Sequence, residues 1–161
     1  MIAKQRIALT VNGRQIEAEV EPRLLLTDFL RGTLGLTGTH VGCEHGVCGA
    51  CTILLDGRSA RACLMLAVQA DGSSLETVES LGTPEMLSDL QKDFREHHAL
   101  QCGFCTPGML MTATDLLRTQ PLASDEEIRD GLSGNLCRCT GYENIVRAVR
   151  AAAARRGGTP S

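Results

Sequence analysis

Aromatic residues are scarce in this chain of 161 residues: they make up 2% of the sequence, with no Trp, one Tyr and three Phe. Long runs of basic residues are also missing, and the formal net charge is -3 at pH 7. Proteins that bind nucleic acids combine basic surfaces with aromatic side chains that stack on bases. The composition therefore predicts that no nucleic acid is a partner.

Uninterrupted apolar stretches are missing as well. The N-terminal residues run straight into alternating polar and apolar positions, without the apolar core of a secretory signal. No segment resembles the roughly 20 apolar residues that cross a bilayer. We therefore expect a cytoplasmic protein with no membrane span.

The shortage of aromatic residues also limits the core. The chain is 43% hydrophobic and 22% charged, which is ordinary for a soluble globular protein. Small aliphatic cores usually need additional stabilisation such as a bound metal. The composition thus favours two small metal-stabilised domains over one medium domain.

Cysteine, by contrast, is plentiful. The eight cysteines form two sets of four with none left over, namely Cys43, Cys48, Cys51 and Cys63, then Cys102, Cys105, Cys137 and Cys139. Thiolates favour zinc, copper(I) or iron-sulfur clusters, and a site made only of sulfur offers no obvious position for water or substrate. A reducing cytoplasm keeps thiols available for metal, which argues against a disulfide framework. We predict a metal protein that transfers electrons and has no catalytic residue.

The first set has the pattern C-x4-C-x2-C, with its fourth cysteine further along the chain. The first three match the plant-type ligand run of a 2Fe-2S cluster. Gly42 precedes the first of them, and Gly46 and Gly49 lie between them; these glycines allow a loop to wrap closely around a cluster. Structural zinc also accepts four cysteines, but zinc loops favour C-x2-C in both halves of the site. The spacing favours a 2Fe-2S cluster.

The fourth ligand of this set is predicted on a β-hairpin over residues 52–63, with its turn at 56–57. Counting back along the ladder from the turn pairs Ala50 with Cys63. This register would place Cys63 diagonally beside Cys51.

The second set is less diagnostic, because its spacings are C-x2-C and C-x-C. Zinc would be a fair interpretation of this set alone. A plant-type run upstream favours a second 2Fe-2S cluster, since two such clusters form an electron relay. Each cysteine pair lies between two predicted helices, so two similar helical hairpins would pool their four thiolates. We also expect the helix dipole to favour thiolate at cysteines that begin helices.

The order of predicted elements indicates an α+β fold. Hairpins over 6–20 and 52–63, a helix near 25–30 and a short strand at 75–78 predict an N-terminal ferredoxin-like (β-grasp) domain, residues 1–80. Four helices then predict a C-terminal four-helix bundle domain, residues 85–155, followed by a frayed polar tail, residues 156–161. The first of these helices is expected to include Met86 and Leu87.

Two histidines lie close to the first set but do not change the assignment. A Rieske centre needs two histidines in a repeated pattern with cysteine, and the second half of that pattern is absent here. His40 and His45 are expected to bond locally within their loop or to be exposed.

Three motifs carry a resemblance to a known family: THVGCEHGVCGACT at 39–52, QCGFCTPG at 101–108 and GNLCRCTGY at 134–142. Over nearly its whole length the chain resembles the small iron-sulfur subunit of the molybdenum hydroxylases, the family of xanthine oxidase, aldehyde oxidoreductase and carbon monoxide dehydrogenase. The chain carries no dinucleotide fingerprint, and we expect it to be the separately encoded type of subunit.

The resemblance implies one 2Fe-2S cluster in each domain. It also implies a complex with a large molybdopterin-binding subunit and a medium FAD-binding subunit, as a heterotrimer or a dimer of heterotrimers. Electrons would leave molybdenum through the helical-domain cluster, then reach the ferredoxin-like cluster and FAD or another acceptor. A glutamine at the position of Gln101 would contact the pterin. A free-standing two-cluster ferredoxin and a zinc-stabilised interaction module remain as alternatives.

Overall fold

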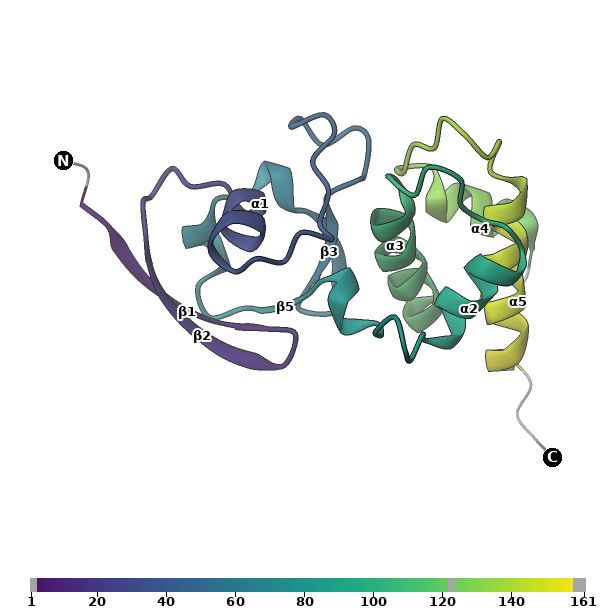
Figure 1. The fold of residues 1–161 in the computed structure, drawn as a ribbon, viewed down its shortest axis with the longest axis horizontal. Coiled ribbons are helices and arrows are strands. Elements are labelled where there is room, and N and C mark those ends of the chain that lie inside the picture. Colours follow the sequence, from purple (N-terminus) through teal and green to yellow (C-terminus); the bar gives the residue numbers. More distant parts are fainter. Residues whose placement is uncertain (1–2, 122–123, 158–161) are drawn as a thin grey trace.

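The computed structural model describes residues 3–121 and 124–157, and Figure 1 shows two parts joined side by side. We call residues 3–80 the strand half and residues 89–157 the helical half. The strand half lies to the left in Figure 1 and the helices to the right. Together they make an α+β protein.

The chain opens with a hairpin of β1 (Gln5–Val11) and β2 (Arg14–Val20). Its turn residues, Asn12 and Gly13, both have positive φ, as a two-residue turn of this type requires. This hairpin is therefore confirmed.

The sheet has five strands in the order β2-β1-β5-β3-β4. The added strands are β3 (Thr52–Leu55), β4 (Arg58–Arg61) and β5 (Ser74–Glu76), and only the β1–β5 pair is parallel among the strand pairs described. The predicted strand at 75–78 is shorter than expected, because the chain enters a 3-10 turn at Val78.

One face of this sheet is covered by α1 (Leu26–Asp28), which continues into a π-helical turn, Phe29–Thr33. Leu26, Phe29 and Leu30 are fully buried there. Their spacing is the helical one that the sequence predicts. They share one core with the apolar residues of β1 and β3.

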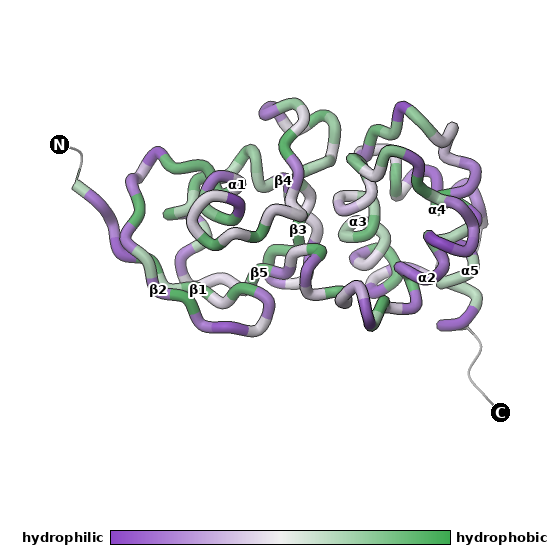
Figure 2. The backbone as a smooth tube through the Cα atoms, in the orientation of Figure 1, coloured by the Kyte–Doolittle hydropathy of each residue, from purple (hydrophilic) through white to green (hydrophobic). Residues whose placement is uncertain are grey.

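The helical half contains α2 (Asp89–Glu96), α3 (Thr106–Thr119), α4 (Asp125–Leu132) and α5 (Glu143–Gly157). Buried residues of all four form a second core. Figure 2 shows hydrophobic residues distributed through both halves rather than gathered in one continuous run. Among the described residues, no helix combines the length and apolar character needed to cross a bilayer.

Two helix boundaries differ from the prediction. Helix α2 begins at Asp89, because Ser88 caps it in a reciprocal capping box with Gln91. Met86, which was expected inside this helix, is 77% exposed in the preceding turn. At the other end, α5 continues through Gly157, so residues 156 and 157 are helical, while the rest of the predicted tail, 158–161, lies outside the described residues.

The two halves are joined along α3, which packs against β3. The buried Asp115 carboxylate on α3 accepts a 2.8 Å hydrogen bond from the Ser59 amide of β4. Arg118 of α3 donates two hydrogen bonds to Glu76 of β5, at 2.8 and 3.0 Å. The fold therefore fixes the strand half against the helical half away from the cysteines.

Candidate metal centres

Cys43, Cys48 and Cys51 lie on one loop between the π-helical turn and β3. Positive φ at Glu44, Gly46 and Gly49 folds this loop back on itself. At Gly46 a Cβ atom would also come within 2.5 Å of Leu64 Cδ1, so the position is crowded as well as left-handed. Local backbone geometry thus gathers three thiols.

The structure places Cys63 beside Cys51, but by a different route from the predicted ladder. The β3–β4 pairing follows the expected register from Leu55↔Arg58 and stops at Thr52↔Arg61, so the predicted Ala50–Cys63 pair is wrong. The chain leaves the ladder in a 3-10 turn, Ala62–Leu64, and the Ala62 amide donates to the Cys51 carbonyl at 3.3 Å. This hydrogen bond brings Cys63 next to Cys51 along the two chain segments.

The second set comes from two connections far apart in the sequence. Cys102 and Cys105 precede α3, and Cys137 and Cys139 lie between α4 and α5. The Sγ atoms of Cys102 and Cys139 are 3.5 Å apart, and Cys105 contacts Cys137. All four line one cavity of about 320 Å³. The two connections do pool two thiols each, as the sequence predicts.

Within each set the cysteines form two close pairs. In the first set the Cys48 amide donates to the Cys43 sulfur, and the Ala62 amide, next to Cys63, donates to the Cys51 carbonyl. In the second set the sulfurs of Cys102 and Cys139 are 3.5 Å apart, and Cys105 and Cys137 line the same cavity. A single zinc gathers four ligands at one point, whereas the two irons of a 2Fe-2S cluster share four cysteines. The arrangement fits two 2Fe-2S clusters.

The thiol environments are consistent with a bound positive centre. Burial raises the pKa of Cys51 to about 11 and that of Cys105 to about 12. The expected benefit of a helix start is thus outweighed by burial at Cys105. In the first set, the backbone amide of Cys48 hydrogen-bonds to the Cys43 sulfur and lowers the pKa of Cys43 to about 6. A bound metal would offset the cost of burying the thiolates of Cys51 and Cys105.

Cys137 shows the opposing influences most clearly. Burial pushes its pKa upward, but hydrogen bonds from Thr140, Cys139 and Cys105 together outweigh burial, and the pKa is lowered. The Thr140 hydroxyl lies 3.2 Å from the Cys137 sulfur, and the Cys137 amide donates to the Tyr142 hydroxyl at 2.9 Å. Cys137 is thus held by hydrogen bonds on two sides.

Exposure differs between the pairs. Cys102 and Cys139 are exposed, whereas Cys51 and Cys63 are buried. Gln101 is exposed beside Cys102. The Cys102–Cys139 pair and Gln101 therefore present one edge of the helical half to the outside.

Sequence reasoning missed the role of His40. His45 bonds locally, to the Cys43 carbonyl, as expected. His40 instead contacts the helical half. Its Nδ1 lies 2.8 Å from the Phe104 carbonyl oxygen, and the His40 and Phe104 rings stack with their centroids 4.8 Å apart. Only the fold could show this contact, because the residues are far apart in sequence.

Large apolar side chains are exposed close to both cysteine sets. Val47 (57%) and Leu64 (61%) lie next to ligands of the first set. Leu100, Phe104 and Leu136 lie close to cysteines of the second set along the chain and are 41%, 48% and 52% exposed. Exposed apolar side chains thus neighbour both cysteine sets along the chain.

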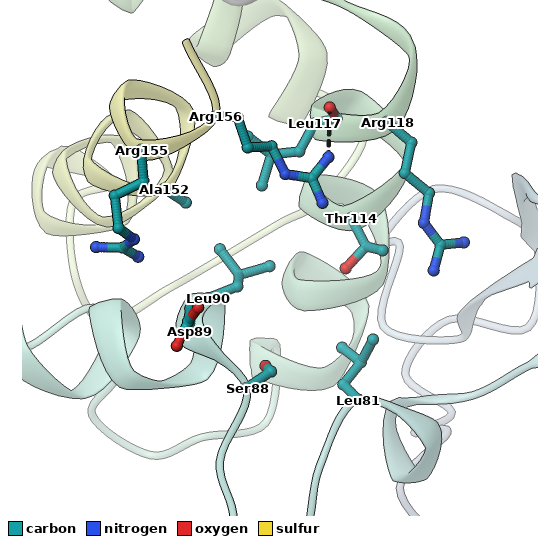
Figure 3. Close-up of a pocket in the computed structure, with 10 residues that line it drawn as sticks. All are labelled: Leu81, Ser88, Asp89, Leu90, Thr114, Leu117, Arg118, Ala152, Arg155 and Arg156. Atoms are coloured by element: carbon teal, nitrogen blue, oxygen red, sulfur yellow. Dashed lines mark hydrogen bonds between the residues drawn. The ribbon is translucent and has the colours of Figure 1, made fainter. Parts of the chain in front are cut away.

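A separate cavity of about 550 Å³ is lined by residues of α2, α3 and α5 (Figure 3). Its three arginines are already engaged: Arg118 with Glu76, Arg155 with Asp93, and Arg156 with the Leu117 carbonyl, the last drawn in Figure 3. No cysteine lines it. This cavity is therefore not part of the metal centres.

Comparison with known proteins agrees with this geometry. Residues 9–81 match the family described as 2Fe-2S iron-sulfur cluster binding domain, and residues 77–150 match the [2Fe-2S] binding domain family. The caffeine dehydrogenase subunit gamma of Pseudomonas sp. (strain CBB1) is 61% identical over 89% of this chain and 88% of its own length. The nicotine 6-hydroxylase small subunit of Paenarthrobacter nicotinovorans is 57% identical over 89% and 86%.

A solved structure gives the same result. Quinoline 2-oxidoreductase from Pseudomonas putida 86 contains a chain that matches with a TM-score of 0.90 and 56% identity, over 98% of this chain and 99% of that one. The aldehyde oxidoreductase of Desulfovibrio gigas matches with a TM-score of 0.91 and 46% identity over 97% of this chain, which corresponds to 18% of the longer enzyme. This chain belongs to the small iron-sulfur subunits of the molybdenum hydroxylase family.

Proposed function

We propose that this chain is the electron-transfer subunit of a multi-subunit molybdenum hydroxylase or dehydrogenase. It relays electrons from a molybdopterin centre on a large subunit, through two 2Fe-2S clusters, to FAD on a medium subunit or to another acceptor. The observation that carries this proposal is the pairing of the cysteines two and two in both sets. Substrate oxidation takes place on the partner.

The eight cysteines are the proposed iron ligands. Cys43, Cys48, Cys51 and Cys63 hold one cluster, and Cys102, Cys105, Cys137 and Cys139 hold the other. Each cluster supplies a one-electron redox centre. The chain sets their potentials through thiolate ligation, burial and hydrogen bonds such as that of Thr140 to the Cys137 sulfur.

The proposed direction of electron flow comes from the family resemblance, and exposure supports it. The exposed pair Cys102 and Cys139 lies beside Gln101, which we propose contacts the pterin of the large subunit. The helical-half cluster then receives electrons first and the strand-half cluster second. The exposed apolar residues around both sites support contacts with two partners, one at each end of the relay.

The proposed domain limits are residues 1–80 for the ferredoxin-like domain and 85–155 for a four-helix bundle domain. Each has its own hydrophobic core, which supports this division. The proposed assembly is a heterotrimer or a dimer of heterotrimers in the cytoplasm, where eight free cysteines remain available for iron.

Metal analysis of the purified complex tests the proposal. We expect a brown-red preparation with about four irons per copy of this chain, as two 2Fe-2S clusters require, together with copurified large and medium subunits. A colourless protein with zinc would instead identify a zinc-stabilised interaction module. Iron clusters in a chain that purifies without partners would identify a free-standing ferredoxin.

A further inference from the structure

The two cysteine sets approach each other through the backbone. The Leu136 amide donates a 2.8 Å hydrogen bond to the Cys48 carbonyl. Leu136 directly precedes Cys137, a member of the second set, and Cys48 belongs to the first. A continuous path therefore runs from the Cys137 sulfur through one peptide unit, across one hydrogen bond and through Cys48 to its own sulfur.

This path is more direct than another contact between the same two regions. His40 bonds to the Phe104 carbonyl at 2.8 Å. However, Val41 and Gly42 separate His40 from Cys43 along the chain. Electronic coupling falls more slowly through covalent and hydrogen bonds than across a gap, so the shorter bonded path dominates.

Asn135 holds in place the hydrogen bond from the Leu136 amide to the Cys48 carbonyl, which we call the crossing. It is a polar side chain with 2% exposure, and its amide group bonds to both halves. Its Nδ2 donates to the Gly49 carbonyl at 3.0 Å, and its Oδ1 accepts from the Thr112 hydroxyl at 2.9 Å. Because a buried amide without partners is unfavourable, these bonds fix the loop between Cys48 and Cys51 against α3.

The backbone around Gly49 is closely packed, so no side chain fits at this position. A Cβ atom on Gly49 would lie 2.5 Å from the Gly134 carbonyl oxygen and 2.7 Å from Asn135 Nδ2. A Cβ atom on Gly108 would lie 2.2 Å from the Gly49 oxygen. Arg61 adds a further bond from the strand half, donating to the Gly134 carbonyl at 2.7 Å.

We propose that the Leu136 amide to Cys48 carbonyl hydrogen bond is the principal link for electron transfer between the two clusters, with Asn135 as its positioning residue. This inference rests on the proposed function, since it needs both clusters. The step carried by the link is the transfer of one electron, which oxidises the centre held by Cys137 and reduces the centre held by Cys48. No covalent bond forms or breaks.

The test uses the purified complex carrying Asn135→Ala, with Asn135→Asp as a second variant of similar shape that lacks the amide donor. Two quantities are measured. The first is the magnetic dipolar splitting between the reduced clusters by electron paramagnetic resonance, and the second is the rate of inter-cluster electron transfer after flash reduction. We expect an altered splitting and a reduced rate, because loss of the Asn135 hydrogen bonds frees the loop that carries Cys48 to move away from Leu136.

Asp115→Asn is the matched control. Asp115 is also buried, at 5% exposure, and also joins the halves, but it bonds to β4 away from the cysteines. It should lower thermal stability without changing the splitting or the rate. An Asn135 variant with full iron content and wild-type splitting and rate would overturn the proposal.

Loss of a cluster in both Asn135 variants, with full loading in Asp115→Asn, would also overturn it, because Asn135 would then serve assembly rather than the link. Failure of the proposed function is distinguishable from either result. In that case the unaltered complex would itself lack iron, sulfide and the two cluster signals.

Discussion

The strand half takes three of its four cysteines from a single loop, Cys43 to Cys51, whereas the helical half draws its cysteines from two connections separated by α3 and α4. Positive φ values shape the first site. Helix packing shapes the second, which closes only when the Cys102–Cys139 and Cys105–Cys137 pairs meet. One site thus depends mainly on local backbone geometry and the other on tertiary structure, although both end as two pairs of thiols.

The largest expected effect comes from removing one ligand of each site. Cys43→Ser should abolish the strand-half cluster and Cys102→Ser the helical-half cluster, because each cluster needs four ligands. Iron should fall from about four to about two per chain in either variant. Iron analysis and electron paramagnetic resonance of the remaining cluster check this.

Turnover of the complex with Cys102→Ser should stop, since the proposed relay enters through the helical half. Full turnover in that variant would contradict the relay order. Loss of both clusters from a single substitution would show that the two sites do not assemble independently.

Core substitutions can test whether each cluster site depends on the core of its own half. Ile53 of β3 and Ile128 of α4 are both fully buried, one in each core. Replacing either with Ala should lower the free energy of unfolding by about 2–5 kcal/mol. In a urea titration, Ile128→Ala should release the helical-half cluster at lower urea than wild type and leave the strand-half signal in place.

Ile53→Ala should do the reverse. Visible circular dichroism follows the clusters, and far-ultraviolet circular dichroism follows the fold. If both clusters bleach together in both variants, the halves unfold as one cooperative unit and the comparison fails.

Glycine substitutions compare the two loops at equal backbone angle. Gly46 and Gly103 both have φ of +81°, so Ala is strained at either position by about 1–2 kcal/mol. At Gly103 an added Cβ atom meets nothing within 4 Å, whereas at Gly46 it meets Leu64. Gly46→Ala should therefore lose stability and cluster content more than Gly103→Ala. Thermal melting and iron content measure the difference, and an equal loss would mean that crowding by Leu64 is relieved.

The smallest expected effect concerns the joint between the halves. The Arg118 hydrogen bonds lower the pKa of Glu76 below its ordinary 4.5. A carboxyl group with a lowered pKa stabilises the fold above its ordinary value and loses this contribution as the pH falls through the lowered one. Glu76→Gln should reduce stability at pH 7 by about 1 kcal/mol or less, because the pair is partly exposed.

Unfolding of Glu76→Gln should consequently depend less on pH below 4.5 than unfolding of the wild type. Denaturant titrations at pH 7 and at acid pH provide the measurement. An unchanged pH dependence would show that this ion pair does not stabilise the joint between the halves.

The sequence predicted features whose causes lie within a few residues. The Asn12-Gly13 turn holds because the positive φ of these residues suits a two-residue hairpin. The Ser124 capping box begins α4 as expected. The cysteine run from Cys43 to Cys51 is equally local, which is why its spacing could be interpreted at all.

Features that join distant segments were predicted less well. One local feature was also wrong: Met86 was expected in α2 because its apolar character fits helical spacing, but the capping box of Ser88 begins the helix later. Cys63 reaches Cys51 by a 3-10 turn that a count of ladder pairs does not predict. His40 finds its partner across the joint between the halves, and Asn135 bonds on both sides of that joint.

By itself the sequence determined the number and grouping of the cysteines, the hairpin turns and the family resemblance, since these depend on residue type and short spacing. The tertiary structure alone decided which cysteine pairs with which in the helical half, and that Leu136 meets Cys48. The physical reason is that short spacing constrains only neighbouring backbone angles, whereas the meeting of distant connections requires both cores to pack.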